Sequence, residues 1–124
     1  MNEAHAPFRP DAFRLDGRRA LITGGGRGIG RACALALSQA GAEVVVVSRT
    51  ATQLQEVVSS VENAGGRALA IATDVGDAAG VDRLVASLTA HWPKGVDILV
   101  NNAAISPHVD AFENLGDDAW SDIF

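Results

Sequence analysis

The stretch at residues 19–30, RALITGGGRGIG, decides the fold. Its first five residues are mostly apolar and predict a strand, and the apolar-periodic segment after the glycines predicts a helix. Glycines at such a turn let the backbone bend tightly and approach a phosphate with no side chain between them. The N–H groups at the start of the helix offer an anion hydrogen bonds and a partial positive charge. The stretch therefore predicts a pyrophosphate-binding loop, and the alternative is a tight turn that binds nothing.

The apolar pattern of the whole chain alternates between strand and helix. Besides the strand at 19–23 and the helix at 29–40, it predicts strands at 44–47, 68–72 and 97–101 and helices that start at Thr50, Asp77 and Gly116. Strands that alternate with helices of this length form βαβ units with right-handed crossovers and a parallel sheet. We therefore expect an α/β fold, a Rossmann-type doubly wound parallel sheet with strand order 3-2-1-4.

The domain organisation follows from this pattern. Residues 1–13 are polar and contain prolines, and they are expected to form a loose N-terminal tail. Residues 14–124 are expected to form a dinucleotide-binding half-domain. No helix stop signal precedes Phe124. The half-domain is therefore expected to be truncated in its fourth helix, and its sheet is expected to be incomplete.

Helical periodicity predicts which side of each helix is buried. The second helix is expected to begin with a capping box, in which the side chains of Thr50 and Gln53 satisfy free backbone N–H groups, and to end at Gly65-Gly66. Cys33 is interpreted as a small buried side chain rather than a nucleophile. The inward-facing residues are expected to be Ile29, Ala32, Cys33, Ala36, Leu37 and Ala40 in the first helix, Leu54, Val57, Val58 and Val61 in the second, Val81, Leu84, Val85 and Leu88 in the third, and Trp120 and Ile123 in the fourth.

Composition argues against several classes of partner. The net charge is −5 and no basic run is present, so nucleic acid is not expected as a partner. No apolar stretch approaches the length of a membrane span, and residues 1–13 do not resemble a secretory signal. The single Cys33 suits a reducing cytosol, so a cytoplasmic location is expected. The three histidines have no metal-ligand spacing, so no metal site is expected.

The end of the second strand bears on the choice of cofactor. An acid at this place would accept hydrogen bonds from the adenosine ribose of NAD, whereas an arginine accommodates the 2′-phosphate of NADP. The chain has Ser48-Arg49 there and no acid. Arg27, in the glycine loop, supplies a second positive charge. The two residues therefore favour NADP(H), the alternative for each being a solvated arginine without a ligand.

Four segments at successive strand ends resemble the short-chain dehydrogenase/reductase family, over about residues 13–124. They are the T-G-x-x-x-G-x-G pattern at 23–30, Ser48-Arg49, Asp74-Val75, and the stretch 101–104, NNAA, which is similar to the family's N-N-A-G segment with Ala104 in place of glycine. Asn101 has an alternative structural role, since a buried amide ties adjacent strands together. The cofactor-binding residues implied are Gly24, Gly26, Arg27, Gly28, Ile29, Gly30, Ser48, Arg49, Asp74, Val75, Asn101, Ala103 and Ala104.

The resemblance implies a catalytic apparatus that does not map onto this chain. The family uses a serine after the fifth strand, a Tyr-x-x-x-Lys pair on the next helix and an asparagine on the fourth helix. The chain has no tyrosine, and its single lysine, Lys94, precedes the fourth strand. We assign no catalytic residue, and we expect this polypeptide alone not to turn over the carbonyl or alcohol substrates of a complete family member.

Three hypotheses about function follow. The chain is the cofactor-binding part of an NADP(H)-dependent oxidoreductase, a stand-alone NADP(H)-binding module, or an interaction protein that pairs through an open sheet edge. That edge is expected at the fourth strand, whose apolar residues 98–100 border no fifth strand, and an edge of this kind favours self-association.

Overall fold

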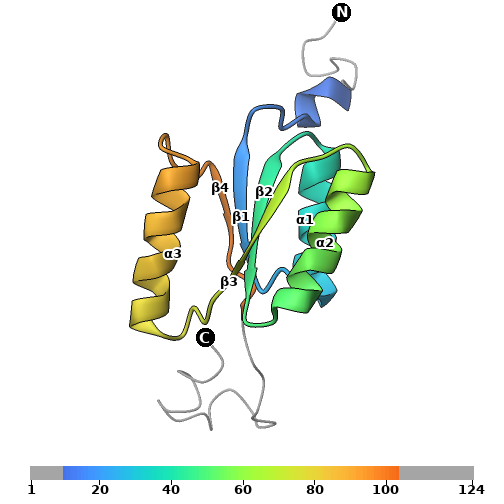
Figure 1. Cartoon of the computed structure of the whole chain (residues 1–124). Helices are drawn as coiled ribbons and strands as arrows, with labels where there is room; N and C mark the ends of the chain where they lie inside the picture. The colour runs from blue at the N-terminus through green and yellow to red at the C-terminus, as the bar shows by residue number, and fades with distance from the viewer. Residues whose placement is uncertain (1–9, 104–124) are drawn as a thin grey trace, which may run out of the picture.

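The computed structural model describes residues 10–103, which form one parallel sheet between two helical layers (Figure 1). A short 3₁₀ helix, η2 (Pro10–Phe13), comes before the first strand. The strands are β1 (Arg19–Thr23), β2 (Glu43–Ser48), β3 (Ala68–Ala72) and β4 (Ile98–Val100), and the helices are α1 (Gly28–Gln39), α2 (Ala51–Asn63) and α3 (Ala78–His91). The expected fourth helix, with Trp120 and Ile123, lies outside the described residues.

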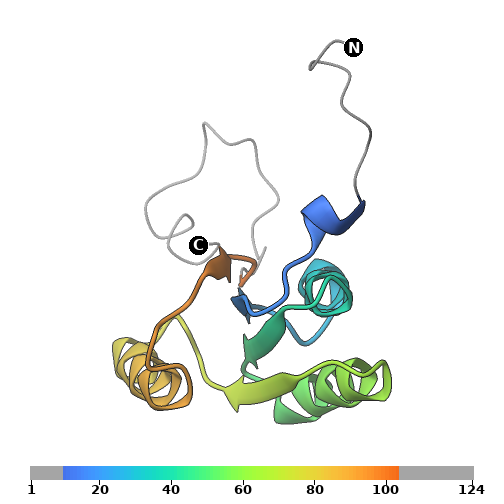
Figure 2. The ribbon, with the colours of Figure 1, turned by 90° about the horizontal axis from the view of Figure 1, so that it is seen from above.

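The strand order is β3-β2-β1-β4 and every pairing is parallel, which confirms the predicted topology. Seen from above, α1 and α2 cover one face of the sheet and α3 lies on the other (Figure 2). This arrangement explains the four-valine run at 44–47, in which every residue is fully buried. Val44 and Val46 pack toward α1 and α2, while Val45 and Val47 pack toward α3.

The expected faces of α2 and α3 are confirmed in part. All four expected residues of α2, from Leu54 to Val61, are buried. In α3, Leu84 and Leu88 are buried, but Val81 and Val85 are exposed, because the buried stripe of this helix is narrow and its third member is Gly80. The packing of α3 also includes Trp92, which is 5% exposed and which the periodicity did not predict.

The face predicted for α1 is confirmed only in part: Leu37 packs against the core and Cys33 and Ala40 are half-buried, but the other three expected residues are exposed. Ile29 is 74% exposed, Ala32 and Ala36 are also exposed, and the buried positions are Gly30 and Ala34. The physical reason is the close approach of Gly30 to the carbonyl group of Gly24. The first turn of α1 lies against the glycine loop, where only a residue without a side chain fits, so the smallest residues face the sheet. Cys33 is half-buried and makes no disulfide.

Candidate cofactor site

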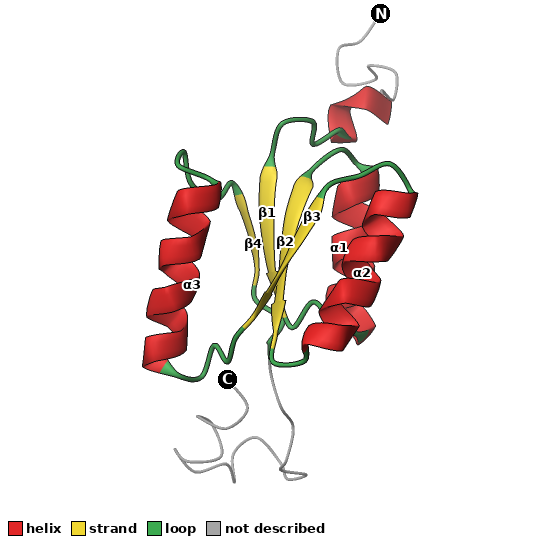
Figure 3. Cartoon of the chain, in the orientation of Figure 1, coloured by secondary structure: helices red, strands yellow, loops and turns green. Residues whose placement is uncertain are grey.

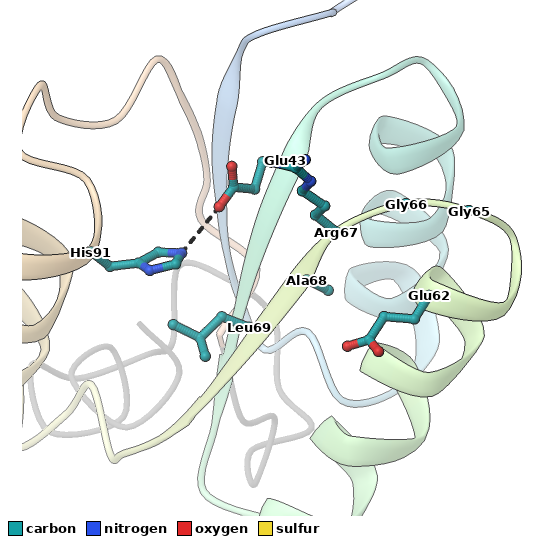
Figure 4. Close-up of a pocket in the computed structure, with 8 residues that line it drawn as sticks. All are labelled: Glu43, Glu62, Gly65, Gly66, Arg67, Ala68, Leu69 and His91. Atoms are coloured by element: carbon teal, nitrogen blue, oxygen red, sulfur yellow. Dashed lines mark hydrogen bonds and ion pairs between the residues drawn. The ribbon is translucent and has the colours of Figure 1, made fainter.

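The predicted site residues that the structure describes lie at one end of the sheet. Because all four strands are parallel, their carboxyl ends lie together, at the lower end of Figure 3. The loops after β1, β2 and β3 and the residues that follow β4 leave the sheet at this end. The pocket drawn in Figure 4 lies at the opposite end, where β2 and β3 begin, and contains none of the predicted site residues.

The glycines of the loop serve different physical needs. Gly24 and Gly28 have φ values of +64° and +57°, a region that favours glycine. A Cβ on Gly24 would also lie 2.9 Å from the carbonyl oxygen of Asn102. A Cβ on Gly30 would overlap the carbonyl group of Gly24, so this position requires glycine for space.

Gly26 is constrained by the second βα loop. It lacks a positive φ, but a Cβ there would lie 3.1 Å from Ser48 Oγ and 3.2 Å from the Cβ of Gln53. The glycine loop and the start of α2 are therefore in close contact, and this contact depends on the missing side chain.

The cations of the site are unpaired. Arg27, Arg49 and Ile29 are all exposed. Within residues 10–103, neither arginine forms an ion pair. The helix α1 begins at Gly28, and its N-cap residue, Arg27, makes no side-chain hydrogen bond to the free N–H groups of the first turn. Unpaired cations and free N–H groups at one sheet end are the features that bind an anion.

The predicted capping box of α2 is not formed. Thr50 is the N-cap residue, but its side chain makes no capping hydrogen bond. Instead, the backbone N–H of Thr50 donates to Ser48 Oγ at 3.3 Å. The serine hydroxyl thus accepts the bond that the Gln53 side chain was expected to accept, because the tight turn after β2 places it closer to this N–H group.

The loop after β3 holds Asp74 in an exposed turn. Asp74 Oδ1 accepts the backbone N–H of Gly76 at 2.8 Å, and its backbone carbonyl accepts the N–H of Asp77 at 3.2 Å. The side chain of Val75 is half-buried and packs against the cluster beneath α3. The turn therefore fixes the direction of the Asp74 carboxylate at the rim of the site.

Two residues that the sequence assigned no role join the glycine loop to β4. The Thr23 hydroxyl donates to the Val100 carbonyl at 3.3 Å and accepts the backbone N–H groups of Asn102 and Ala103 at 3.0 and 3.1 Å. Asn102 Nδ2 also donates to the Gly24 carbonyl at 3.2 Å. The structural tie that is one alternative for Asn101 is made by Asn102, while Asn101 is exposed.

The signal for these two residues was present in the sequence. Thr23 is the polar end of an apolar strand and directly precedes the first loop glycine, and Asn102 is the second of two adjacent asparagines. Adjacent residues of an extended segment point to opposite sides, so one asparagine faces the loop when the other faces solvent. Ala104, which was also assigned to the site, lies outside the described residues.

Residues 10–103 contain neither a cluster of metal ligands nor a helix that could span a membrane. Among residues 10–103, no group of three or more His, Cys, Asp or Glu residues is placed to hold a metal ion. No helix in residues 10–103 is both long and apolar enough to cross a membrane. The residues present fit a dinucleotide, because the glycine loop carries no side chain at four positions, the first turn of α1 has no side-chain cap, and Arg27 and Arg49 are exposed.

A doubly wound parallel sheet with a glycine cradle at its carboxyl end defines a class of nucleotide-binding proteins. A family model described as short chain dehydrogenase matches residues 18–124. The chain belongs to the short-chain dehydrogenase/reductase family of oxidoreductases.

Individual relatives agree with this assignment. Sorbitol dehydrogenase of Cereibacter sphaeroides is 48% identical over 93 residues, which cover 75% of this chain and 35% of that protein. A short-chain type dehydrogenase/reductase from Mycobacterium marinum has a TM-score of 0.76 at 39% identity, covering 91% of this chain and 45% of that one. A metagenomic short-chain oxidoreductase in complex with NADP has a TM-score of 0.76 at 30% identity, covering 88% and 49%. The chain spans between 35% and 42% of the length of the first five curated relatives.

Proposed function

We propose that this chain is the NADP(H)-binding portion of a cytoplasmic short-chain oxidoreductase that reduces a carbonyl group or oxidises a secondary alcohol. The single observation that carries the cofactor preference is Ser48-Arg49 at the end of β2, with no acid to accept hydrogen bonds from a ribose. The similar metagenomic oxidoreductase was solved in complex with NADP, which supports the same choice.

Different residues of the site bind different parts of the cofactor. The backbone at Gly24, Gly26 and Gly28 and the start of α1 hold the pyrophosphate. Arg49, with Arg27 nearby in the glycine loop, holds the 2′-phosphate, since guanidinium groups bind phosphates in a bidentate way. Asp74 and Val75, after β3, would contact the adenine, and Asn101 and Ala103, after β4, would contact the nicotinamide half. When bound, the cofactor supplies or accepts a hydride.

Cofactor titration tests this proposal. NADPH and NADH are titrated separately into the purified chain by calorimetry, and NADPH is expected to bind more tightly. A hydrogen bond to a charged partner contributes about 1.5–3 kcal/mol, or roughly 10- to 150-fold in affinity. Arg49→Asp should remove or reverse the preference. Arg67→Asp makes the same charge change at an exposed arginine at the opposite end of the sheet and should leave the preference unchanged. Equal affinity of the unmodified chain for both cofactors would refute the NADP(H) assignment.

A second candidate function is binding without catalysis, either of NADP(H) or of another protein chain. The exposure of Leu99, 56% in the edge strand β4, favours an interaction surface. The test joins the chain to a downstream segment that carries a serine and Tyr-x-x-x-Lys. If the joined protein binds NADPH but does not reduce carbonyl compounds, the second candidate is favoured.

A further inference from the structure

Gln53 on the first turn of α2 lies against the glycine loop. A Cβ on Gly26 would lie 3.2 Å from the Cβ of Gln53 and 3.3 Å from its Oε1. The side chain is half-buried, although it comes from the exposed end of a helix. The Gln53 side chain therefore packs against the glycine loop as well as belonging to α2.

The carboxamide of Gln53 has no partner within residues 10–103. At this position of a helix, a glutamine side chain ordinarily accepts the N–H of the N-cap residue. Here Ser48 Oγ accepts that N–H, from Thr50, at 3.3 Å. Among the described residues, the Gln53 side chain makes no hydrogen bond, and the first turn of α2 contains no acid that would accept the N–H groups of that turn. A half-buried carboxamide of this kind is available to a ligand.

The groups around Gln53 favour an anion. The Ser48 hydroxyl accepts the Thr50 N–H group through an oxygen lone pair, and its single hydrogen makes no bond within residues 10–103, so it can be donated to a ligand. Arg49, the next residue, carries an unpaired positive charge. The Gln53 carboxamide adds N–H donors. These donors bind a charged phosphate oxygen more strongly than they bind a neutral hydroxyl, because charge-assisted hydrogen bonds are stronger.

We propose that Gln53 is a specificity-determining residue for the adenosine 2′ position, and that its carboxamide donates to the 2′-phosphate beside Ser48 and Arg49. This inference rests on the NADP(H) preference proposed above. It adds a contact from α2 to the contacts from the end of β2, and it assigns Gly26 the role of leaving room for that contact.

The test compares Gln53→Glu with Gln55→Glu. Both variants change the charge equally on the same helix, but Gln55 is exposed and lies about 200° further around the axis. An acid near the start of a helix favours the helix, so neither variant is expected to unfold it, and circular dichroism checks this. NADPH and NADH are then titrated into each variant. Gln53→Glu should weaken NADPH binding by about tenfold, from a lost donor to a charged group, while NADH affinity stays within about twofold.

The controls separate this inference from the proposed function. If the unmodified chain prefers NADPH, and Gln53→Glu and Gln55→Glu change the NADPH-to-NADH affinity ratio equally, Gln53 is not a specificity residue and the NADP(H) assignment stands. If the unmodified chain has no preference, both ideas are refuted. Gly26→Ala gives a second measurement, since its methyl group would displace Gln53 and Ser48 together. This variant should lower the same affinity ratio, and an unchanged ratio would overturn the inference.

Discussion

The hydroxyl of Thr23, at the end of β1, accepts the backbone N–H of Asn102, 79 residues further along the chain, at 3.0 Å. The same hydroxyl accepts the N–H of Ala103 and donates to the carbonyl of Val100. Thr23 is 7% exposed, so all three hydrogen bonds are shielded from water. The strand that precedes the glycine loop is thereby fastened to the segment that follows β4.

Replacing Thr23 with valine should reduce stability and cofactor affinity together. The substitution keeps the shape of the side chain but leaves two backbone N–H groups without an acceptor, and each unsatisfied buried group costs about 1–3 kcal/mol. Urea denaturation measures the loss of stability. Thr89→Val is the control, because its hydroxyl donates only to the Val85 carbonyl on the exposed side of α3. Equal losses in the two variants would mean that the Thr23 hydrogen bonds contribute nothing specific.

Replacing Glu43 should loosen α3. Glu43 Oε1 accepts Trp92 Nε1 at 3.0 Å and contacts His91 Nε2 at 3.1 Å, and Figure 4 shows the contact with His91. Glu43→Ala leaves a buried indole N–H without a partner, so the free energy of unfolding should fall by about 1–3 kcal/mol.

Two variants define the origin of that loss. Glu43→Gln keeps an acceptor oxygen and should retain most of the stability. Glu62→Ala removes an exposed glutamate of α2 and should have little effect. If Glu43→Ala is as stable as Glu62→Ala in urea, the contact with Trp92 does not hold α3 in place.

The stability of the chain should depend on pH through Asp97. The Arg19 side chain hydrogen-bonds this carboxylate at 3.0 Å and, with the backbone N–H of Arg19, lowers the pKa of Asp97 from its ordinary value of 3.8. The carboxylate binds a proton less readily in the folded chain than in the unfolded one. Its contribution to stability is therefore complete above the ordinary pKa and is lost as the pH falls through the lowered one.

Denaturation curves between pH 6 and pH 2 test this dependence. Asp97→Asn should flatten the acid limb of the stability profile. Some slope should remain, because Arg14 also lowers the pKa of Asp16. A profile for Asp97→Asn that runs parallel to the original would show that the pair with Arg19 does not couple folding to pH.

The purified chain should self-associate through β4. This strand pairs with β1 alone among the described strands, and Leu99 in its centre is 56% exposed. An unpaired apolar strand edge is a template for another chain, and a lysine on such an edge opposes pairing. Sedimentation at several concentrations should show association that Leu99→Lys reduces. Val85→Lys is the control, because Val85 is similarly exposed but lies on α3. It should reduce association less than Leu99→Lys does if the chains pair through the strand edge. A monomer at high concentration without cofactor would contradict the prediction.

Much of the fold was predictable because its signals are local. The valine run at 44–47 and the glycines at 24–30 each report the backbone conformation of their own segment. The order of the strands followed as well, since right-handed crossovers leave few arrangements for a parallel βαβ sheet. The carboxyl ends of the strands had to meet at one edge, so the candidate site could be located before any side chain was placed.

The side-chain contacts were decided by the tertiary structure. The sequence assigned Gln53 to a capping box, but Ser48 satisfies the Thr50 N–H group and Gln53 lies against Gly26 instead. The periodicity of α1 favoured Ile29, yet close approach to the Gly24 carbonyl puts Gly30 inside and Ile29 outside. Periodicity depends only on neighbours along the chain. Which side chain reaches a given N–H group depends on the distance between segments, and packing the helices onto the sheet sets that distance.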